Sequence, residues 1–205
     1  MTGNPQPTFN ALALDSGLLA TPFRIQTNWH VITGAPSCGK TTLINLLAKA
    51  GFRIAPEGAR LYLEQELTKG QTIEQVRSDI IHLQCCIKDK QLEIEHALPA
   101  NEFIFLDRAI PDCLAWYRVF GMNPNEFLQN CFHYRYASIF MLDRLPLAQN
   151  GLRFKDETLQ SFTHEWHTRD YLALGYPIIR VPVMPPEERL SFALQVLTER
   201  GLIVR

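Results

Sequence analysis

Five short apolar runs divide the chain from residue 29 onward. They are WHVIT at 29–33, FRIA at 52–55, FIFL at 103–106, SIFML at 138–142 and PIIRV at 177–181. The segments between them carry apolar residues at helical spacing. Runs of four or five apolar residues that alternate with helices are typical of parallel strands buried on both faces. We therefore expect an α/β fold in which helices cover a parallel sheet.

The helical segments have recognisable ends. Thr41 to Ala50 predicts a helix that stops at Gly51, a residue suited to a helix C-terminus. Residues 57–98 read as two helices, broken near residues 69–71 and ended by Pro99; the second begins with Thr72 as its N-cap. This long insertion either closes over a substrate or forms a plain covering layer, and the sequence favours neither.

The bulk composition indicates one domain. The chain has 205 residues, is 46% hydrophobic and carries a formal charge of −1. Such a chain can bury one substantial core, which we expect over residues 28–205. Residues 1–27 have no clear hydrophobic period and hold three prolines within the first 22 positions, which predicts an irregular N-terminal arm. The basic residues are scattered, so we expect no nucleic-acid partner.

The cysteines and the N-terminus bear on location. The five cysteines form neither a C-x-x-C motif nor a zinc-binding spacing, which favours reduced thiols in a cytoplasmic protein. The weak apolar stretch ALALDSGLLA is interrupted by Asp15 and has no basic segment before it. We therefore expect neither a signal peptide nor a membrane span. The oligomeric state is left open.

The sequence GAPSCGKTT at 34–42 follows the pattern G-x-x-x-x-G-K-T of a phosphate-binding loop. Its glycines let successive N–H groups cradle a phosphate, its lysine reaches the β- and γ-phosphates, and its first threonine suits Mg²⁺. The predicted strand before it and helix after it are the required flanks. The alternative is a glycine-rich turn without a ligand. The residues predicted to bind ATP, with GTP possible, are Gly34, Ala35, Pro36, Ser37, Cys38, Gly39, Lys40, Thr41 and Thr42.

Five segments together resemble one family. They are GAPSCGKTT, IAPEGARLYLEQ at 54–65, FIFLDR at 103–108, NGLRFKDE at 150–157 and LGYPIIRVPVMPPEERLSFAL at 174–194. They look like the small AAA-labelled P-loop ATPase family that includes the ribosylnicotinamide kinase domain of NadR-type proteins. The resemblance covers about residues 29–198. It implies a P-loop NTPase of kinase type, with a five-stranded parallel sheet in the order 2-3-1-4-5 and helices on both faces.

That strand order brings two LDR sequences beside the loop, at 106–108 and 142–144. Ligands of open α/β sheets bind at the carboxyl ends of the strands. By similarity to nucleotide kinases, Asp107 is predicted to organise Mg²⁺ together with Thr41, and Arg108 to bind a substrate phosphate or carboxylate. Alternatively, Asp107 caps the next helix and Arg108 pairs with a surface acid. Asp143 is a second candidate for the metal-organising acid.

Glu57 follows the second strand, where P-loop nucleoside kinases place an acid that accepts the proton of the attacking hydroxyl. Arg60, one helical turn further on, is predicted to hold Glu57 or to bind substrate. The structural alternative is a glutamate favoured by the helix dipole, with Arg60 as its ion-pair partner.

Residues 143–157 have the proline, asparagine and glycine of a mobile loop. The resemblance implies a lid there, and Arg153 is the predicted lid arginine that stabilises phosphoryl transfer, with Arg144, Lys155 and Arg169 as competitors. The pair His164 and His167 lacks the spacing of a zinc motif.

The aromatic residues of the predicted helix at 112–122 are explained either as core or as a ring-stacking wall for an acceptor.

These features favour a kinase that transfers phosphate from Mg-ATP to a small nucleoside- or nucleotide-like acceptor. Lys40, Glu57, Asp107 and Arg153 are its predicted catalytic residues. The alternative is an ATP- or GTP-dependent regulatory protein, although no N-K-x-D guanine motif follows a strand. A mechanical ATPase is disfavoured because no helical domain follows the predicted sheet.

Overall fold

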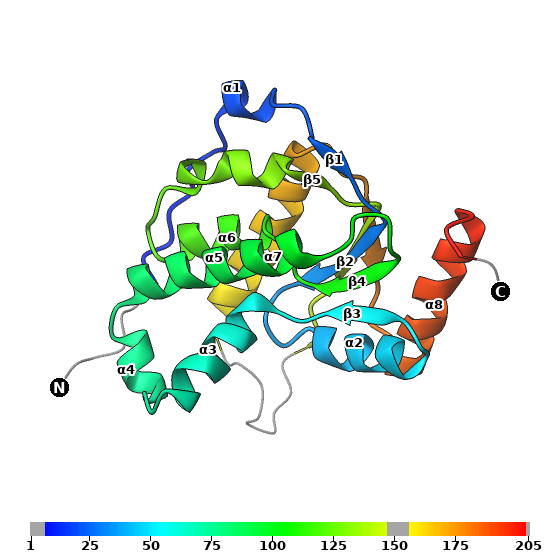
Figure 1. The fold of residues 1–205 in the computed structure, drawn as a ribbon, viewed down its shortest axis with the longest axis horizontal. Helices are drawn as coiled ribbons and strands as arrows, with labels where there is room; N and C mark the ends of the chain where they lie inside the picture. Colours follow the sequence, from blue (N-terminus) through cyan, green and yellow to red (C-terminus); the bar gives the residue numbers. More distant parts are fainter. Residues whose placement is uncertain (1–6, 147–155, 204–205) are drawn as a thin grey trace.

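The apolar runs form the strands of one parallel sheet (Figure 1). In the computed structural model, which describes residues 7–146 and 156–203, its strands are β2 (Trp29–Gly34), β3 (Arg53–Ala55), β4 (Ile104–Asp107), β6 (Ser138–Leu142) and β7 (Ile178–Val181). They lie in the order β3-β4-β2-β6-β7, and every neighbouring pair is parallel. The predicted order 2-3-1-4-5 is therefore confirmed, with β2 in the centre.

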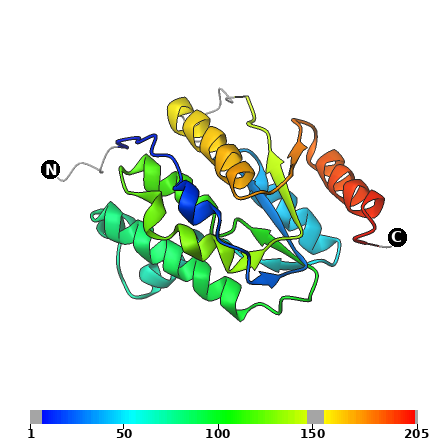
Figure 2. The ribbon, with the colours of Figure 1, turned by 90° about the horizontal axis from the view of Figure 1, so that it is seen from above.

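Both faces of the sheet are covered by helices (Figure 2). Successive side chains of β2 lie in two different hydrophobic cores. Ile32 packs with α2 (Lys40–Lys49) and α8 (Pro186–Glu199), and Val31 packs on the opposite face of the sheet. That opposite face is covered by α5 (Ile80–Ala97), α6 (Asp112–Val119) and α7 (Glu157–Ala173). The continuous apolar character of the strands follows from burial on both faces.

The insertion after β3 holds one helix more than predicted. It consists of α3 (Gly58–Thr68), α4 (Ile73–Arg77) and α5. The predicted start at Thr72 is confirmed, because Thr72 and Gln75 form a reciprocal capping box. The prediction of one continuous second helix is wrong. Asp79 accepts a hydrogen bond from the His82 backbone N–H at 2.9 Å and thereby begins α5 as a separate helix.

The N-terminal segment lies across the α6 side of the molecule. Within residues 7–27 the regular elements are α1 (Ser16–Leu19) and β1 (Ile25–Gln26); β1 pairs in parallel with β5 (Tyr134–Arg135). Before them, the N–H groups of Thr8 and Phe9 both donate to the carbonyl of Val119, at the end of α6. The connection from α6 to β5 contains the 3₁₀ helices η1 (Pro124–Glu126) and η2 (Leu128–Phe132).

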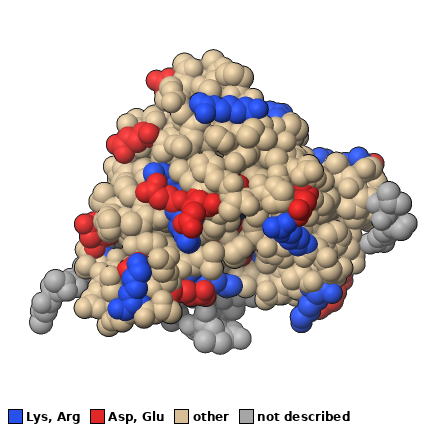
Figure 3. All heavy atoms as spheres, viewed as in Figure 1, with Lys and Arg blue, Asp and Glu red and all other residues tan. Residues whose placement is uncertain are grey.

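Charged side chains of both signs are interspersed among uncharged ones on the face drawn in Figure 3.

Among the helices in the described ranges, none is long and apolar enough to cross a lipid bilayer.

Candidate active site

The phosphate-binding loop joins the centre of the sheet to the start of α2. Gly34 and Gly39 have φ angles of +141° and +95°, values that side-chain-bearing residues rarely adopt. At Gly34 a Cβ atom would also lie 2.8 Å from the carbonyl oxygen of Leu142 on β6. The backbone shape therefore requires glycine at both positions, and at Gly34 the close approach to β6 requires it as well.

Lys40 is folded back onto the loop. Its Nζ donates to the carbonyl oxygens of Gly34 and Ala35 at 3.0 and 2.7 Å. Burial lowers the pKa of Lys40, the nearby Arg108 lowers it further, and the carboxylates of Glu57 and Asp107 act in the opposite direction. The lysine therefore shares one electrostatic environment with the predicted base and the predicted metal-organising acid.

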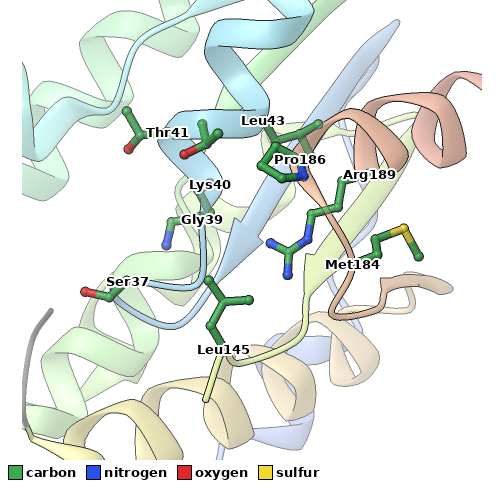
Figure 4. A pocket seen from close by; sticks show the side chains of 10 residues that line it. Ser37, Gly39, Lys40, Thr41, Leu43, Leu145, Met184, Pro186 and Arg189 are labelled. Carbon is green, nitrogen blue, oxygen red and sulfur yellow. The ribbon is translucent and has the colours of Figure 1, made fainter. Parts of the chain in front are cut away.

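A cavity of about 440 Å³ opens beside the loop. Its lining combines residues of the loop and of α2 with residues from later in the chain (Figure 4). They are Ser37, Gly39, Lys40, Thr41, Thr42 and Leu43, together with Leu145, Met184, Pro186 and Arg189. Arg189, on α8, reaches the loop and donates from Nη1 to the carbonyl oxygen of Cys38 at 2.7 Å. Arg189 was not predicted as a site residue, because a contact between residues 38 and 189 leaves no periodic signal in the sequence.

The DR sequence at the end of β4 brings an acid and a base to the site. Asp107 is buried, and its Oδ1 has no hydrogen-bond partner in the described part of the chain. Burial raises the pKa of Asp107, and the carboxylate of Glu57 raises it further. Arg108 has a φ of +69° and is ion-paired with Glu57 and Asp112, at 2.9 and 2.8 Å.

These contacts test two of the structural alternatives. The proposed partner of Arg108, a surface acid, is wrong, because Asp112 is buried and Glu57 is partly buried. The proposed ion pair between Glu57 and Arg60 is also absent from the described residues, in which Arg60 is exposed and makes no ion pair. Substrate binding by Arg60 and Arg108 stays a prediction.

Asp112 anchors this corner of the site. It accepts hydrogen bonds from the hydroxyls of Thr33 and Tyr171, the latter at 2.6 Å, and pairs with Arg108. The ring of His167 lies 3.7 Å from it and is fully buried, which lowers the pKa of His167 to about 3. Asp112 therefore links the end of β2 to α7 and fixes Arg108.

A second cavity, the Glu57 pocket, lies between the insertion helices and α6. It has a volume of about 370 Å³. Its lining is Pro7, Glu57, Ala59, Leu63, Arg77, Ile80, Leu83, Gln84, Ile87, Trp116, Phe120, Asp156 and Leu159. Trp116 and Phe120 stack with ring centroids 6.4 Å apart and line this pocket, whereas Tyr117 is buried in the core. The core interpretation is therefore confirmed for Tyr117, and the interpretation of Trp116 and Phe120 as a stacking wall for an acceptor stays a prediction.

Glu57 is held by its backbone as well as by Arg108. The adjacent N–H of Gly58 donates to Gln91 Oε1 of α5 at 3.1 Å. Gln91 Nε2 in turn donates to Glu95, which also accepts from the backbone N–H of Ile110 at 2.8 Å. Helix α5 therefore ties the start of α3 to the loop after β4, and both segments carry predicted site residues.

Two further predictions concern Asp143 and Arg153. Asp143 pairs with Arg180 at 2.8 Å, so its carboxylate is engaged at the sheet edge. Arg153, the predicted lid arginine, and its competitor Lys155 lie outside the described residues.

The residues at the loop fit a magnesium ion bound together with phosphates. Asp107 offers a buried carboxylate oxygen that has no partner among the described residues, and Thr41 offers a hydroxyl at the start of α2. Mg²⁺ takes one or two protein oxygens and completes its shell with phosphate and water. Within the described ranges, no group of three His, Cys, Asp or Glu side chains could hold a metal by itself.

The central β2 strand, the loop that follows it and the strand order define a kinase-like P-loop fold. Residues 29–189 match the family model described as AAA domain, and the chain belongs to that family. No curated protein matches the sequence.

Solved structures share the fold. A NadR protein in complex with NAD and AMP-PNP has a TM-score of 0.63 at 19% identity, covering 87% of this chain and 51% of its own. A NadR protein in complex with NR has a TM-score of 0.63 at 20% sequence identity, and the match covers 87% of this chain and 53% of the NadR chain. This chain therefore spans about half the length of either NadR chain. Thymidylate kinase from Candida albicans has a TM-score of 0.55 at 13% sequence identity, and the match covers 86% of this chain and 93% of the thymidylate kinase chain. Shikimate kinase from Aquifex aeolicus has a TM-score of 0.53 at 15% sequence identity, and the match covers 85% of this chain and 98% of the shikimate kinase chain.

Proposed function

We propose that this protein is a kinase that transfers the γ-phosphate of ATP to a hydroxyl group of a small acceptor. ATP would bind at the loop between β2 and α2, and the acceptor would bind in the Glu57 pocket. The observation that carries the proposal is the position of Glu57. Its side chain lines the second pocket, is ion-paired with Arg108 and interacts electrostatically with Lys40 at the loop.

On the nucleotide side, the loop N–H groups and Lys40 would hold the β- and γ-phosphates. The apolar side chains of Leu145 and Met184 and the guanidinium of Arg189 line the cavity beside the loop and would contact the rest of the nucleotide. Thr41 and Asp107 would hold Mg²⁺, which when bound neutralises charge on the phosphates.

On the acceptor side, Glu57 is the candidate base. Its Oε1 accepts from Arg108 Nε at 2.9 Å, which leaves Oε2 for an acceptor hydroxyl. The hydroxyl oxygen would form a bond to the γ-phosphorus while the bond to the β–γ bridging oxygen breaks. Glu57 would take the hydroxyl proton, and ADP would leave. Arg153 is the residue proposed to supply the positive charge that stabilises the transferred phosphoryl group.

The comparisons support this reaction class. NadR structures are named for complexes with AMP-PNP and with NR, and the other two neighbours are named as kinases. They make ATP the first phosphate donor to test and ribosylnicotinamide one of the acceptors.

The test is incubation of the protein with γ-labelled ATP or GTP and Mg²⁺, against a panel of nucleosides, nucleotides and ribosylnicotinamide. The proposal expects label on at least one acceptor and faster transfer than hydrolysis. Nucleotide binding without transfer to any acceptor would contradict it and would favour a nucleotide-dependent regulatory protein.

A further inference from the structure

One stripe of α5 runs from the Glu57 pocket to the loop after β4. Residues 80, 84, 87, 91 and 95 follow one another at intervals of three or four, so they share a helix face. Three of them are buried polar side chains: Gln84, Gln91 and Glu95 expose 7%, 3% and 1% of their surface. Buried polar groups are costly unless they are hydrogen-bonded.

Two of these three side chains have full sets of partners. Gln91 bonds Gly58, Glu95 and the carbonyl oxygen of Arg108, the last at 3.4 Å. Glu95 accepts from Gln91, from the N–H of Ile110 and from the hydroxyl of Tyr136 at 2.8 Å. They are structural members of the stripe, because they connect three segments of the fold.

Gln84 differs from them. It lines the Glu57 pocket, and among residues 7–146 and 156–203 no hydrogen bond engages its amide. The lining near it on α5 is apolar, namely Ile80, Leu83 and Ile87. Its amide atoms are not fully enclosed by protein, although most of the residue is buried. An amide that lines a pocket from an apolar wall, without a hydrogen-bond partner among the described residues, is the arrangement expected of a group that pairs with a ligand.

We propose that Gln84 is a specificity-determining residue that pairs with the polar edge of a planar ring on the acceptor. The proposal rests on the kinase function proposed above. A primary amide presents one acceptor oxygen and two donor hydrogens. It therefore selects a ring edge that carries a hydrogen-bond donor beside an acceptor, as lactams, aminopyrimidines and carboxamides do.

The aromatic wall agrees with a flat ligand. Trp116 and Phe120 line the same pocket, and aromatic side chains favour stacked or edge contacts with a ring. Glu57 lines the same pocket. One cavity therefore holds a candidate base, two aromatic side chains that could stack on a ring, and the amide of Gln84 that would pair with the polar edge of that ring.

A comparison of Gln84→Leu with Gln91→Leu separates a ligand-binding amide from a structural one. Gln84→Leu removes no hydrogen bond of the fold, so its melting temperature should equal or exceed that of the wild type. Gln91→Leu breaks three contacts and should melt lower by at least about 5 °C. If both variants lost stability equally, Gln84 would be structural and the proposal would be overturned.

The specificity readout is equilibrium binding by titration calorimetry. The probes are uridine, cytidine, inosine and ribosylnicotinamide, with phenyl riboside as the analogue that keeps the ring and the sugar but lacks the polar edge. The wild type should bind at least one edge-bearing probe about tenfold or more tightly than phenyl riboside, and Gln84→Leu should remove that preference. A preference retained in Gln84→Leu, or none in the wild type, would contradict the proposal.

Binding and transfer can fail separately. A wild-type edge preference that Gln84→Leu removes, without label transfer to the preferred probe, would support the role of Gln84 in binding and refute the kinase function. Label transfer that is equally efficient in wild type and Gln84→Leu would do the reverse.

Discussion

Arg108 shows how single residues are fixed in this site. Its φ of +69° lies in the left-handed region, which is costly for a residue with a side chain. Ion pairs to Glu57 and to the buried Asp112 hold it there. Such strain persists where surrounding contacts determine it, and here it turns the Arg108 side chain toward the predicted base.

His30 is predicted to make the stability of the fold depend on pH. It is buried on β2, shares a 2.7 Å hydrogen bond between Nδ1 and Ser138 Oγ, and its pKa is lowered from 6.5 to about 4 by burial. The unfolded chain binds this proton more readily than the folded protein. The stabilisation is therefore complete above pH 6.5 and is lost as the pH falls toward 4.

The measurement is the free energy of unfolding of wild type and His30→Asn in urea between pH 7 and pH 4. Relative to His30→Asn, the wild type should lose up to about 3 kcal/mol as the pH falls. A difference between the two proteins that stays constant over this range would show that His30 titrates normally in the fold.

At the scale of elements, the contact between α3 and α5 decides where Glu57 sits. The first residue of α3, Gly58, is buried against α5 and donates its N–H to Gln91 Oε1. A Cβ atom at position 58 would lie 2.9 Å from Gln91 Oε1 and 3.0 Å from the Gln91 backbone nitrogen. The two helices approach this closely only because residue 58 is glycine.

Gly58→Ala should therefore move the start of α3 away from α5. We expect a destabilisation of about 1–3 kcal/mol, the usual cost of overpacking a buried contact, measured by urea unfolding. Gly17→Ala is the matched control: a Cβ atom there would meet only Asp15 Oδ1, at 3.1 Å, so its stability should change by less than about 0.5 kcal/mol. Equal stability of Gly58→Ala and wild type would refute the close contact.

At the scale of the whole molecule, the strands were predictable because each apolar run is a local signal. The phosphate-binding loop was predictable for the same reason, since its residues are contiguous in GAPSCGKTT. Strand order came from family resemblance, because pairing between β2 and strands far along the chain has no local signal. The start of α5 at Asp79 was missed, although an aspartate N-cap is a local feature.

The contacts that assemble the site could not be predicted in this way. Arg189 meets Cys38, Arg108 meets Glu57, and Gln91 meets Gly58 across 151, 51 and 33 positions of sequence. Each depends on how elements pack after the chain has folded. The sequence therefore predicted the residue types of a phosphoryl-transfer site more fully than the partners that hold them.

In the proposed function, one molecule carries both a nucleotide site and a base for an acceptor. The most direct test measures ATP affinity and label transfer in Glu57→Gln, with Lys40→Ala as the variant that should lose ATP binding. Glu165→Gln, which removes an exposed ion pair with Arg169 on α7, is the matched control and should match the wild type in both measurements. Glu57→Gln should bind ATP within about twofold of wild type, whereas its transfer rate should fall by about 10²–10⁴-fold. Full transfer activity in Glu57→Gln would contradict the account.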